Sequence, residues 1–161
     1  MKRVCGLDLA GGARIGLIVV TSRGAKLVTD TITTRTNRKE GLRGRHSRLS
    51  ELGRDVLHHA AVCDLVVVQD VGVGPLDRAG AWWWVVGGLI RREVPVAVLP
   101  AAVVKRTAGD LPGLYPEANI AKCEEAAALA HLGAVWLGLD VSALDKHRQV
   151  AGAEWPEMII S

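Results

Sequence analysis

The chain has 161 residues, of which 49% are hydrophobic and 23% charged, and its formal net charge is +3. This balance excludes a disordered polypeptide, and the length predicts one domain, residues 1–161, that buries roughly 70% of the surface exposed by its unfolded chain. Three cysteines without a CxxC pair argue against a disulfide framework or a structural zinc site and favour a reducing, cytoplasmic location. No apolar stretch is long enough to cross ~30 Å of hydrocarbon, so we expect no membrane association.

Five segments are typical of strands, and they alternate with helices only in the second half of the chain. Three consecutive strands predict an antiparallel meander, and two later strands separated by helices predict parallel crossovers. The predicted strands are residues 4–9, 15–20, 26–34, 64–70 and 94–99. Helices are predicted through Leu42, Leu49, Leu52 and Val56, over residues 76–92, briefly after Pro100, and over residues 119–137, with a loop at 112–116. The predicted fold class is therefore α/β, a mixed five-stranded sheet with helices on both faces. Residues 138–161 form a C-terminal tail without clear periodicity.

Basic residues concentrate in segment 35–54, which carries seven of them against two acidic residues. A block of this density favours a phosphate-binding surface. The alternative is a solvated helix face.

Asp8 is an ionisable residue inside an apolar strand, where a carboxylate is costly unless it is paired or binds a metal. Gln69 and Asp70 end another apolar strand. If the two strands are neighbours, side chains at one level can share an ion. Successive residues point to opposite faces, so only one of Gln69 and Asp70 can share a site with Asp8. The alternative is that Asp70 caps a turn and Gln69 makes ordinary hydrogen bonds.

The last predicted helix offers a third acidic group. Glu125 shares a helical stripe with Leu129, Leu132 and Trp136, so these apolar members are expected to face the sheet and Glu125 to lie at the start of the buried side. Lys122 precedes Glu125 on the same stripe, and Glu124 lies about 100° away from it. The alternative for both glutamates is a solvated first turn, which the helix dipole favours.

Several segments in order resemble the RuvC-type Holliday junction resolvases of the RNase H-like superfamily. The segment 4–8 followed by a glycine turn and 15–19 is similar to their opening hairpin, and 66–71 to their second catalytic strand. Residues 76–92 resemble their dimer helix, 103–107 a basic stretch, and 125–130 their final helix. The resemblance covers roughly residues 3–137, and the compact chain is similar to bacteriophage-encoded members.

The resemblance implies Mg²⁺-dependent endonuclease activity on four-way DNA junctions, with paired symmetric nicks made by a homodimer. Two Mg²⁺ ions per site are implied, with Mn²⁺ as a substitute. The catalytic residues it implies are Asp8, Gln69, Glu124, Glu125 and Lys105. The metal ligands it implies are Asp8, Gln69 and Glu125, with Asp70 as the alternative to Gln69 and Glu124 as the alternative to Glu125. The DNA-binding residues expected from it and from the basic block are Arg14, Arg38, Lys39, Arg43, Arg45, Arg48, Lys105, Arg106 and Lys122.

The chain departs from the family pattern at Gln69, which stands where the resemblance implies a catalytic glutamate. Three explanations are open: Asp70 substitutes after a one-residue shift, the site is naturally weakened, or the chain is an inactivated Glu-to-Gln variant. We favour the last because glutamine preserves the shape of glutamate while removing its charge.

Three consecutive tryptophans, Trp82, Trp83 and Trp84, together with Val86 make the predicted helix 76–92 unusually apolar. They predict a dimer interface, since tryptophan is favoured at interface centres. The alternative is that part of this set packs on the chain's own sheet.

Two other functions on the same fold are open. One is a broader nuclease that cuts branched DNA or flaps. The other is a non-catalytic protein that binds branched DNA, in which Gln69 is native. An actin-like ATPase module also begins with an aspartate before a glycine-rich hairpin, but the chain has no room for the second lobe that such a module requires.

Overall fold

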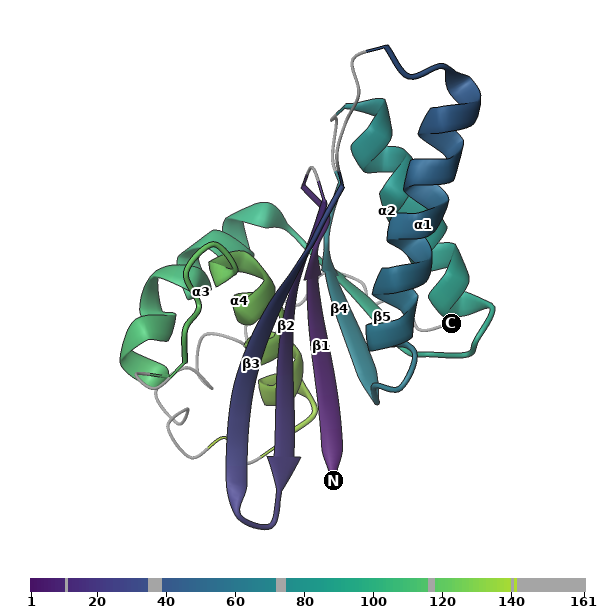
Figure 1. Ribbon diagram of the computed structural model, residues 1–161. Coiled ribbons are helices and arrows are strands. Elements are labelled where there is room, and N and C mark those ends of the chain that lie inside the picture. The colour runs from purple at the N-terminus through teal and green to yellow at the C-terminus, as the bar shows by residue number, and fades with distance from the viewer. Residues whose placement is uncertain (11, 35–38, 72–74, 116–117, 140, 142–161) are drawn as a thin grey trace.

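The computed structural model describes residues 1–10, 12–34, 39–71, 75–115, 118–139 and 141. Five strands form one sheet in the order β3-β2-β1-β4-β5 (Figure 1). The strands are β1 (Lys2–Asp8), β2 (Gly12–Thr21), β3 (Gly24–Thr33), β4 (Leu65–Gln69) and β5 (Val96–Leu99). β1, β2 and β3 pair antiparallel, whereas β4 runs parallel to β1 and to β5. The predicted mixed sheet of three antiparallel strands followed by parallel ones is confirmed.

Helices cover both faces of the sheet, as predicted (Figure 1). They are α1 (Leu42–Ala60), α2 (Leu76–Ile90), α3 (Ala101–Leu114) and α4 (Glu124–Trp136). Alternate strand residues point to opposite faces, so the core divides into two clusters. One cluster packs against α1 and α2 and includes Leu7, Val68 and Leu89, and the other packs against α3 and α4 and includes Val4, Val67 and Leu129.

Two helix predictions were wrong at their ends. The helix predicted from residue 119 begins at Glu124, because Lys122 has a φ of 67° and this left-handed conformation cannot belong to a right-handed helix. The short helix after Pro100 extends to Leu114 through Pro112, a residue predicted to begin a loop. Leu111 anchors this last turn, since it is fully buried and its carbonyl accepts a hydrogen bond from the Tyr115 amide.

Within the described residues, no helix combines the length and the apolar character needed to span a membrane.

Candidate active site

The sheet register places Asp8 and Gln69 side by side. The last registered pair of the parallel strands β1 and β4 is Leu7 with Val68, and Asp8 and Gln69 are the next residue of each strand. Asp8 shares its face with Gly6, which lies against the backbone of α4. Asp70 directly follows β4, its position alternates to the opposite face from Gln69, and it is exposed. The register therefore selects Gln69 rather than Asp70 as the neighbour of Asp8.

Both side chains are buried and each carries an oxygen without a hydrogen bond. Asp8 is 1% exposed and Gln69 is 7% exposed. The Oδ1 atom of Asp8 and the Oε1 atom of Gln69 have no hydrogen-bond partner. Buried polar atoms are normally satisfied, so two such oxygens on adjacent strands mark a position prepared for another group.

Two arginines compensate the buried charge of Asp8. Arg14 lies directly opposite Asp8 across the β1–β2 pair, and its Nη1 donates to Asp8 Oδ2 at 2.9 Å. Arg78 comes from the first turns of α2, and its Nη2 lies 4.0 Å from Asp8 Oδ1. A buried carboxylate needs such partners, because an unpaired one costs several kcal/mol of folding free energy, on the order of 3–5.

Gln69 is tied to α2 through its backbone. The indole Nε1 of Trp82 donates to the Gln69 carbonyl oxygen at 2.9 Å, and Trp82 itself is only 7% exposed. This hydrogen bond satisfies the indole, which is the usual condition for burying tryptophan. The end of β4 is therefore fixed by a residue of the helix that also supplies Arg78.

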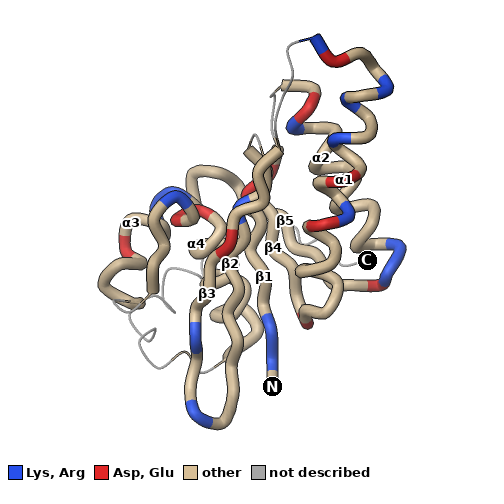
Figure 2. Tube along the Cα trace, in the orientation of Figure 1, with Lys and Arg blue, Asp and Glu red and all other residues tan. Residues whose placement is uncertain are grey.

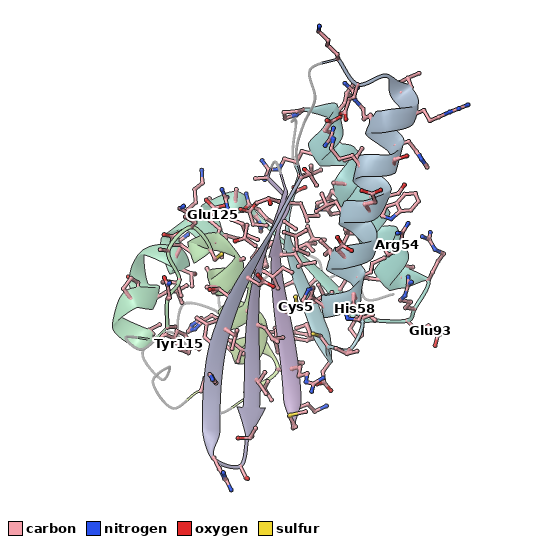
Figure 3. All side chains as sticks on the ribbon, viewed as in Figure 1. Cys5, Arg54, His58, Glu93, Tyr115 and Glu125 are labelled. Atoms are coloured by element: carbon pink, nitrogen blue, oxygen red, sulfur yellow. The ribbon has the colours of Figure 1, made fainter. Side chains whose placement is uncertain are left out.

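The start of α4 lies across β1 and β2 because two glycines allow a close approach. A Cβ atom on Gly6 would lie 2.1 Å from the Ala126 oxygen, and one on Gly16 would lie 2.5 Å from it. Figure 3 shows Glu125 at the same end of the molecule as the carboxyl end of β1. Glu125 is half-buried and Glu124 is exposed, so Glu125 is the better candidate for the site.

Two further expectations for this helix were wrong. Lys122 lies in the turn before α4 rather than on a helical stripe with Glu125, and it is exposed. Trp136 is 40% exposed, whereas Leu129 and Leu132 are buried as predicted. Because α4 packs directly on the strand backbone, residues on all sides of its middle are buried, whereas Trp136 at its end is partly exposed. The helical spacing from Glu125 therefore predicts burial correctly only for the middle of α4.

The site offers oxygen atoms of the kind that bind a divalent cation. Asp8, Gln69 and Glu125 offer oxygen donors, which Mg²⁺ prefers, and two of these oxygens are unsatisfied. However, no group of three or more His, Cys, Asp or Glu side chains within the described ranges could hold a metal ion. The carboxylates of Asp8, Asp70, Glu124 and Glu125 therefore do not form a group of three in the part of the chain that the structure describes, and the expected pair of Mg²⁺ ions held by these residues and Gln69 stays a prediction.

The predicted DNA-binding residues fall into two groups. Lys39, Arg43, Lys105, Arg106 and Lys122 are exposed, and Arg38 lies outside the described residues. Arg45 and Arg48 instead form ion pairs at the upper ends of α1 and α2, where Figure 2 shows both charge signs. Arg48 Nη2 lies 2.6 Å from Asp77 Oδ2 and 2.5 Å from Glu40 Oε1, and Arg45 Nε lies 3.3 Å from Asp77 Oδ1.

Arg48 is consequently a structural residue rather than an available DNA contact. Its side chain is 11% exposed. The hydrogen bonds from Arg48 lower the pKa of the Glu40 carboxyl, which is the expected effect of an adjacent guanidinium. The expectation that Arg48 binds DNA phosphates is therefore corrected.

Two of the predicted dimer residues are buried in the chain's own core and two are exposed. Trp82 and Val86 belong to the chain's own core, at 7% and 5% exposure, so they are not available to a partner. Trp83 is 65% exposed and Trp84 is 40% exposed. Successive helical residues are about 100° apart, which explains why three tryptophans in a row cannot share one environment.

Arg78 is the residue of this site that sequence reasoning missed. It lies on a helix of the opposite layer, and no spacing relates it to Asp8 in the sequence. The parallel β1–β4 pair places the carboxyl end of β4 beside Asp8, and α2, which supplies Arg78, contacts that end of β4 through the Trp82–Gln69 hydrogen bond.

No protein-family model matches the chain, and no curated protein matches it either. Solved structures do. A RuvC structure from Thermus thermophilus superposes with a TM-score of 0.61 at 20% identity, covering 84% of this chain and 96% of that one. T. thermophilus RuvC in complex with a Holliday junction substrate gives 0.60 at 17% identity, covering 86% and 97%. The fowlpox virus Holliday junction resolvase gives 0.51 at 10% identity, covering 85% and 99%.

These likenesses identify the fold. The chain has the RNase H-like fold of the RuvC-type resolvases, as the resemblance of its segments implied, and the match covers nearly the whole length of the two RuvC chains.

Proposed function

We propose that the protein is a metal-dependent endonuclease that resolves four-way DNA junctions. The observation that carries this proposal is that Asp8 and Gln69 follow the last registered pair of β1 and β4, and that each carries an unsatisfied buried oxygen. The fold that presents this pair is shared with Holliday junction resolvases, one of which was solved in complex with a junction.

The residues that would hold a divalent cation are Asp8, Gln69 and Glu125. Such an ion supplies an activated water and stabilises the charge on the leaving oxygen of a phosphodiester. Among these three residues, Asp8 contributes a buried charge, and Gln69 contributes a neutral amide oxygen where a second charge would bind the ion more strongly. We therefore expect weak cation binding, which replacing Gln69 with glutamate strengthens.

The basic residues of this chain would position the DNA. Arg14 and Arg78 lie at Asp8, and exposed Lys105 and Arg106 lie on α3. Positive side chains around a scissile phosphate stabilise the charge that develops during cleavage. Contacts from Lys39 and Arg43 to phosphates would orient an arm without reading its sequence.

Symmetric cleavage of a junction requires a two-fold dimer, and α2 offers the surface for it. Trp83 and Leu76 are 65% and 82% exposed. We expect Trp83→Ser to yield folded monomers in analytical ultracentrifugation, with an unchanged circular dichroism spectrum, because the side chain lies outside the core. A dimer that persists in this variant would contradict the assignment.

The test is cleavage of a synthetic four-way junction, a flap and a plain duplex, each with and without Mg²⁺ or Mn²⁺. The chain is compared with its Asp8→Asn and Gln69→Glu variants. We expect Gln69→Glu to make paired symmetric nicks in the junction at least tenfold faster than the chain itself, and Asp8→Asn to make none. Cutting the flap as efficiently as the junction would establish the broader branched-DNA nuclease instead.

A second candidate is a non-catalytic protein that binds branched DNA. It is favoured by the Arg14–Asp8 ion pair, which already compensates the carboxylate, together with the neutral Gln69. Junction binding by the chain and by Gln69→Glu, with no cleavage by either in Mg²⁺ or Mn²⁺, would establish this function and reject the nuclease.

A further inference from the structure

A groove between the second half of α1 and the end of α2 carries three arginines, a histidine and a tryptophan. It has a volume of 540 Å³, within the range of about 300–1,000 Å³ that small-molecule sites occupy. Arg54 and His58 come from α1, and Arg91 and Arg92 directly follow the end of α2. Figure 3 shows Arg54 and His58 on α1, on the opposite side of the sheet from Glu125. We refer to this feature as the α1–α2 groove.

The charge of the α1–α2 groove is uncompensated by its own walls. None of its lining residues is acidic. The ion pairs found among the described residues include neither Arg54 nor Arg91, and Arg92 donates only to the Gly88 carbonyl oxygen, at 2.9 Å. All three arginines are exposed. Uncompensated guanidinium groups converging on one cavity select an anionic ligand, and their planar form suits phosphate.

Trp84 lines this groove and packs against α1. A Cβ atom on Gly53 would lie 1.8 Å from Trp84 Cδ1, so the indole occupies the notch that this glycine leaves in α1. The His46 ring meets the indole edge-on, with ring centroids 6.0 Å apart. Glycine inside a helix costs about 1 kcal/mol relative to alanine. Gly53 therefore lowers the stability of α1 at the position where it makes room for the Trp84 indole, and this indole is still 40% exposed.

A second glycine shapes the floor of the groove. A Cβ atom on Gly88 would lie 2.5 Å from Leu57 Cδ1, so Gly88 of α2 accommodates a lining residue of α1. The two helices therefore approach each other through glycines on both sides. The contacts of Gly53 with Trp84 and of Gly88 with Leu57 both lie between α1 and α2, where the groove is formed.

We propose that the α1–α2 groove binds single-stranded nucleic acid, with phosphates on Arg54, Arg91 and Arg92 and one unpaired base stacked on Trp84. Arginine with an exposed indole is the combination that binds a strand without reading its sequence. An unpaired base is required because only a splayed nucleotide exposes its face to the ring. The groove lies away from Asp8, so it would hold a strand outside the cleavage site. The inference rests on the proposed function only in taking nucleic acid as the ligand.

The test measures binding of a fluorescent twelve-residue oligothymidine in EDTA, so that no cleavage is involved. The double variant Arg54→Gln/Arg91→Gln is compared with a matched control, Arg23→Gln/Lys26→Gln, in which the two exposed residues lie in the β2–β3 hairpin. We expect the groove variant to bind at least tenfold more weakly. Its slope of log affinity against log salt should fall by roughly 1.4, which is about 0.7 for each lost phosphate contact.

Trp84→Leu supplies the second readout, with sedimentation measured in parallel. We expect roughly tenfold weaker binding at an unchanged oligomeric state, because a base loses its stacking platform. Three results would overturn the proposal. The first is an equal loss of oligonucleotide affinity in the groove variant and in the hairpin variant. The second is a loss of affinity in Trp84→Leu that occurs only when the oligomer dissociates. The third is that polyglutamate displaces the bound oligonucleotide as effectively, per charge, as unlabelled oligothymidine does. Failure of junction cleavage alone would leave all these binding results unaffected.

Discussion

The two helical layers of this protein are built in opposite ways. On one face, α4 lies directly on the backbone of β1 and β2, and nine of its residues, from Ala126 to Ala134, are buried. On the other face, α1 and α2 reach the sheet through large side chains such as Val56, Trp82 and Leu89. This second layer leaves Leu76, Trp83 and Ile90 with at least 41% of their surface exposed.

The difference separates a layer that is packed within the chain from a layer whose side chains are exposed and available to a binding partner. The α4 layer is closed, and its tight contact holds Glu125 at the end of the sheet where Asp8 and Gln69 meet. The α1–α2 layer is open, because it exposes hydrophobic and basic side chains in a groove and along one helix. Large exposed apolar side chains near one another indicate an interaction surface, whereas scattered ones do not.

The largest expected effect breaks the closed layer. Gly6→Val places atoms where the Ala126 oxygen lies 2.1 Å from a Cβ position, so α4 must move away from β1. We expect a loss of about 3 kcal/mol or more in the free energy of unfolding, measured by urea titration. Gly109→Ala is the control, because Gly109 lies in α3 with open space around it and alanine should stabilise the helix by about 0.5–1 kcal/mol. Equal stability of the two variants would contradict the close approach.

Gln69→Glu tests the site that the two layers share. A second buried carboxylate beside Asp8 repels it, so we expect the metal-free variant to be about 1–3 kcal/mol less stable at pH 7. Millimolar Mg²⁺ should recover this loss in a thermal melt, because a bound cation stabilises the folded state. Gln69→Leu keeps the size of the side chain without an oxygen donor, and its melting temperature should not respond to Mg²⁺. The same Mg²⁺ response in both variants would contradict the site.

Arg48→Gln tests the ion pairs at the top of the open layer. Loss of the hydrogen bonds to Glu40 and Asp77 should lower the melting temperature by roughly 2–6 °C at pH 7. The folded protein lowers the pKa of Glu40, so the stabilisation is present above the ordinary carboxyl pKa and is lost as the pH falls through the folded value. The difference between the two proteins should therefore shrink below about pH 4. Arg43→Gln, at an exposed position, should melt like the parent chain across the whole range.

The smallest effect concerns the closed layer at high pH. Burial raises the pKa of Tyr115 to about 12, and its hydroxyl lies 3.3 Å from Nδ1 of His131, a fully buried residue of α4. The unfolded chain releases this proton near pH 10, so stability falls as the pH rises from there towards 12. Tyr115→Phe should flatten this part of the melting-temperature profile. An unchanged alkaline slope would show that other groups cause it.

The candidate site was partly predictable. Asp8 could be found because a carboxylate inside an apolar strand needs a partner, and Gln69 because it ends a second apolar strand. The choice between Gln69 and Asp70 depended on the register of β1 with β4, and no property of either segment alone sets that register. Arg78 could not be found at all, since its contact with Asp8 joins opposite layers through the sheet order.

Contacts with distant segments also explain why the sequence predicted only in part the roles of the basic residues in 35–54 and of the three tryptophans. Composition located the excess of arginine in residues 35–54 and the apolar run in α2, but only packing separated Arg48 from Arg43 and Trp82 from Trp83. The sequence by itself determined the strands, the mixed sheet and its helical layers, because hydrophobic periodicity and chain order are local properties. Only the tertiary structure decided which charges are paired, which aromatic rings are exposed and which oxygens lack a partner, because those depend on neighbours supplied by distant segments.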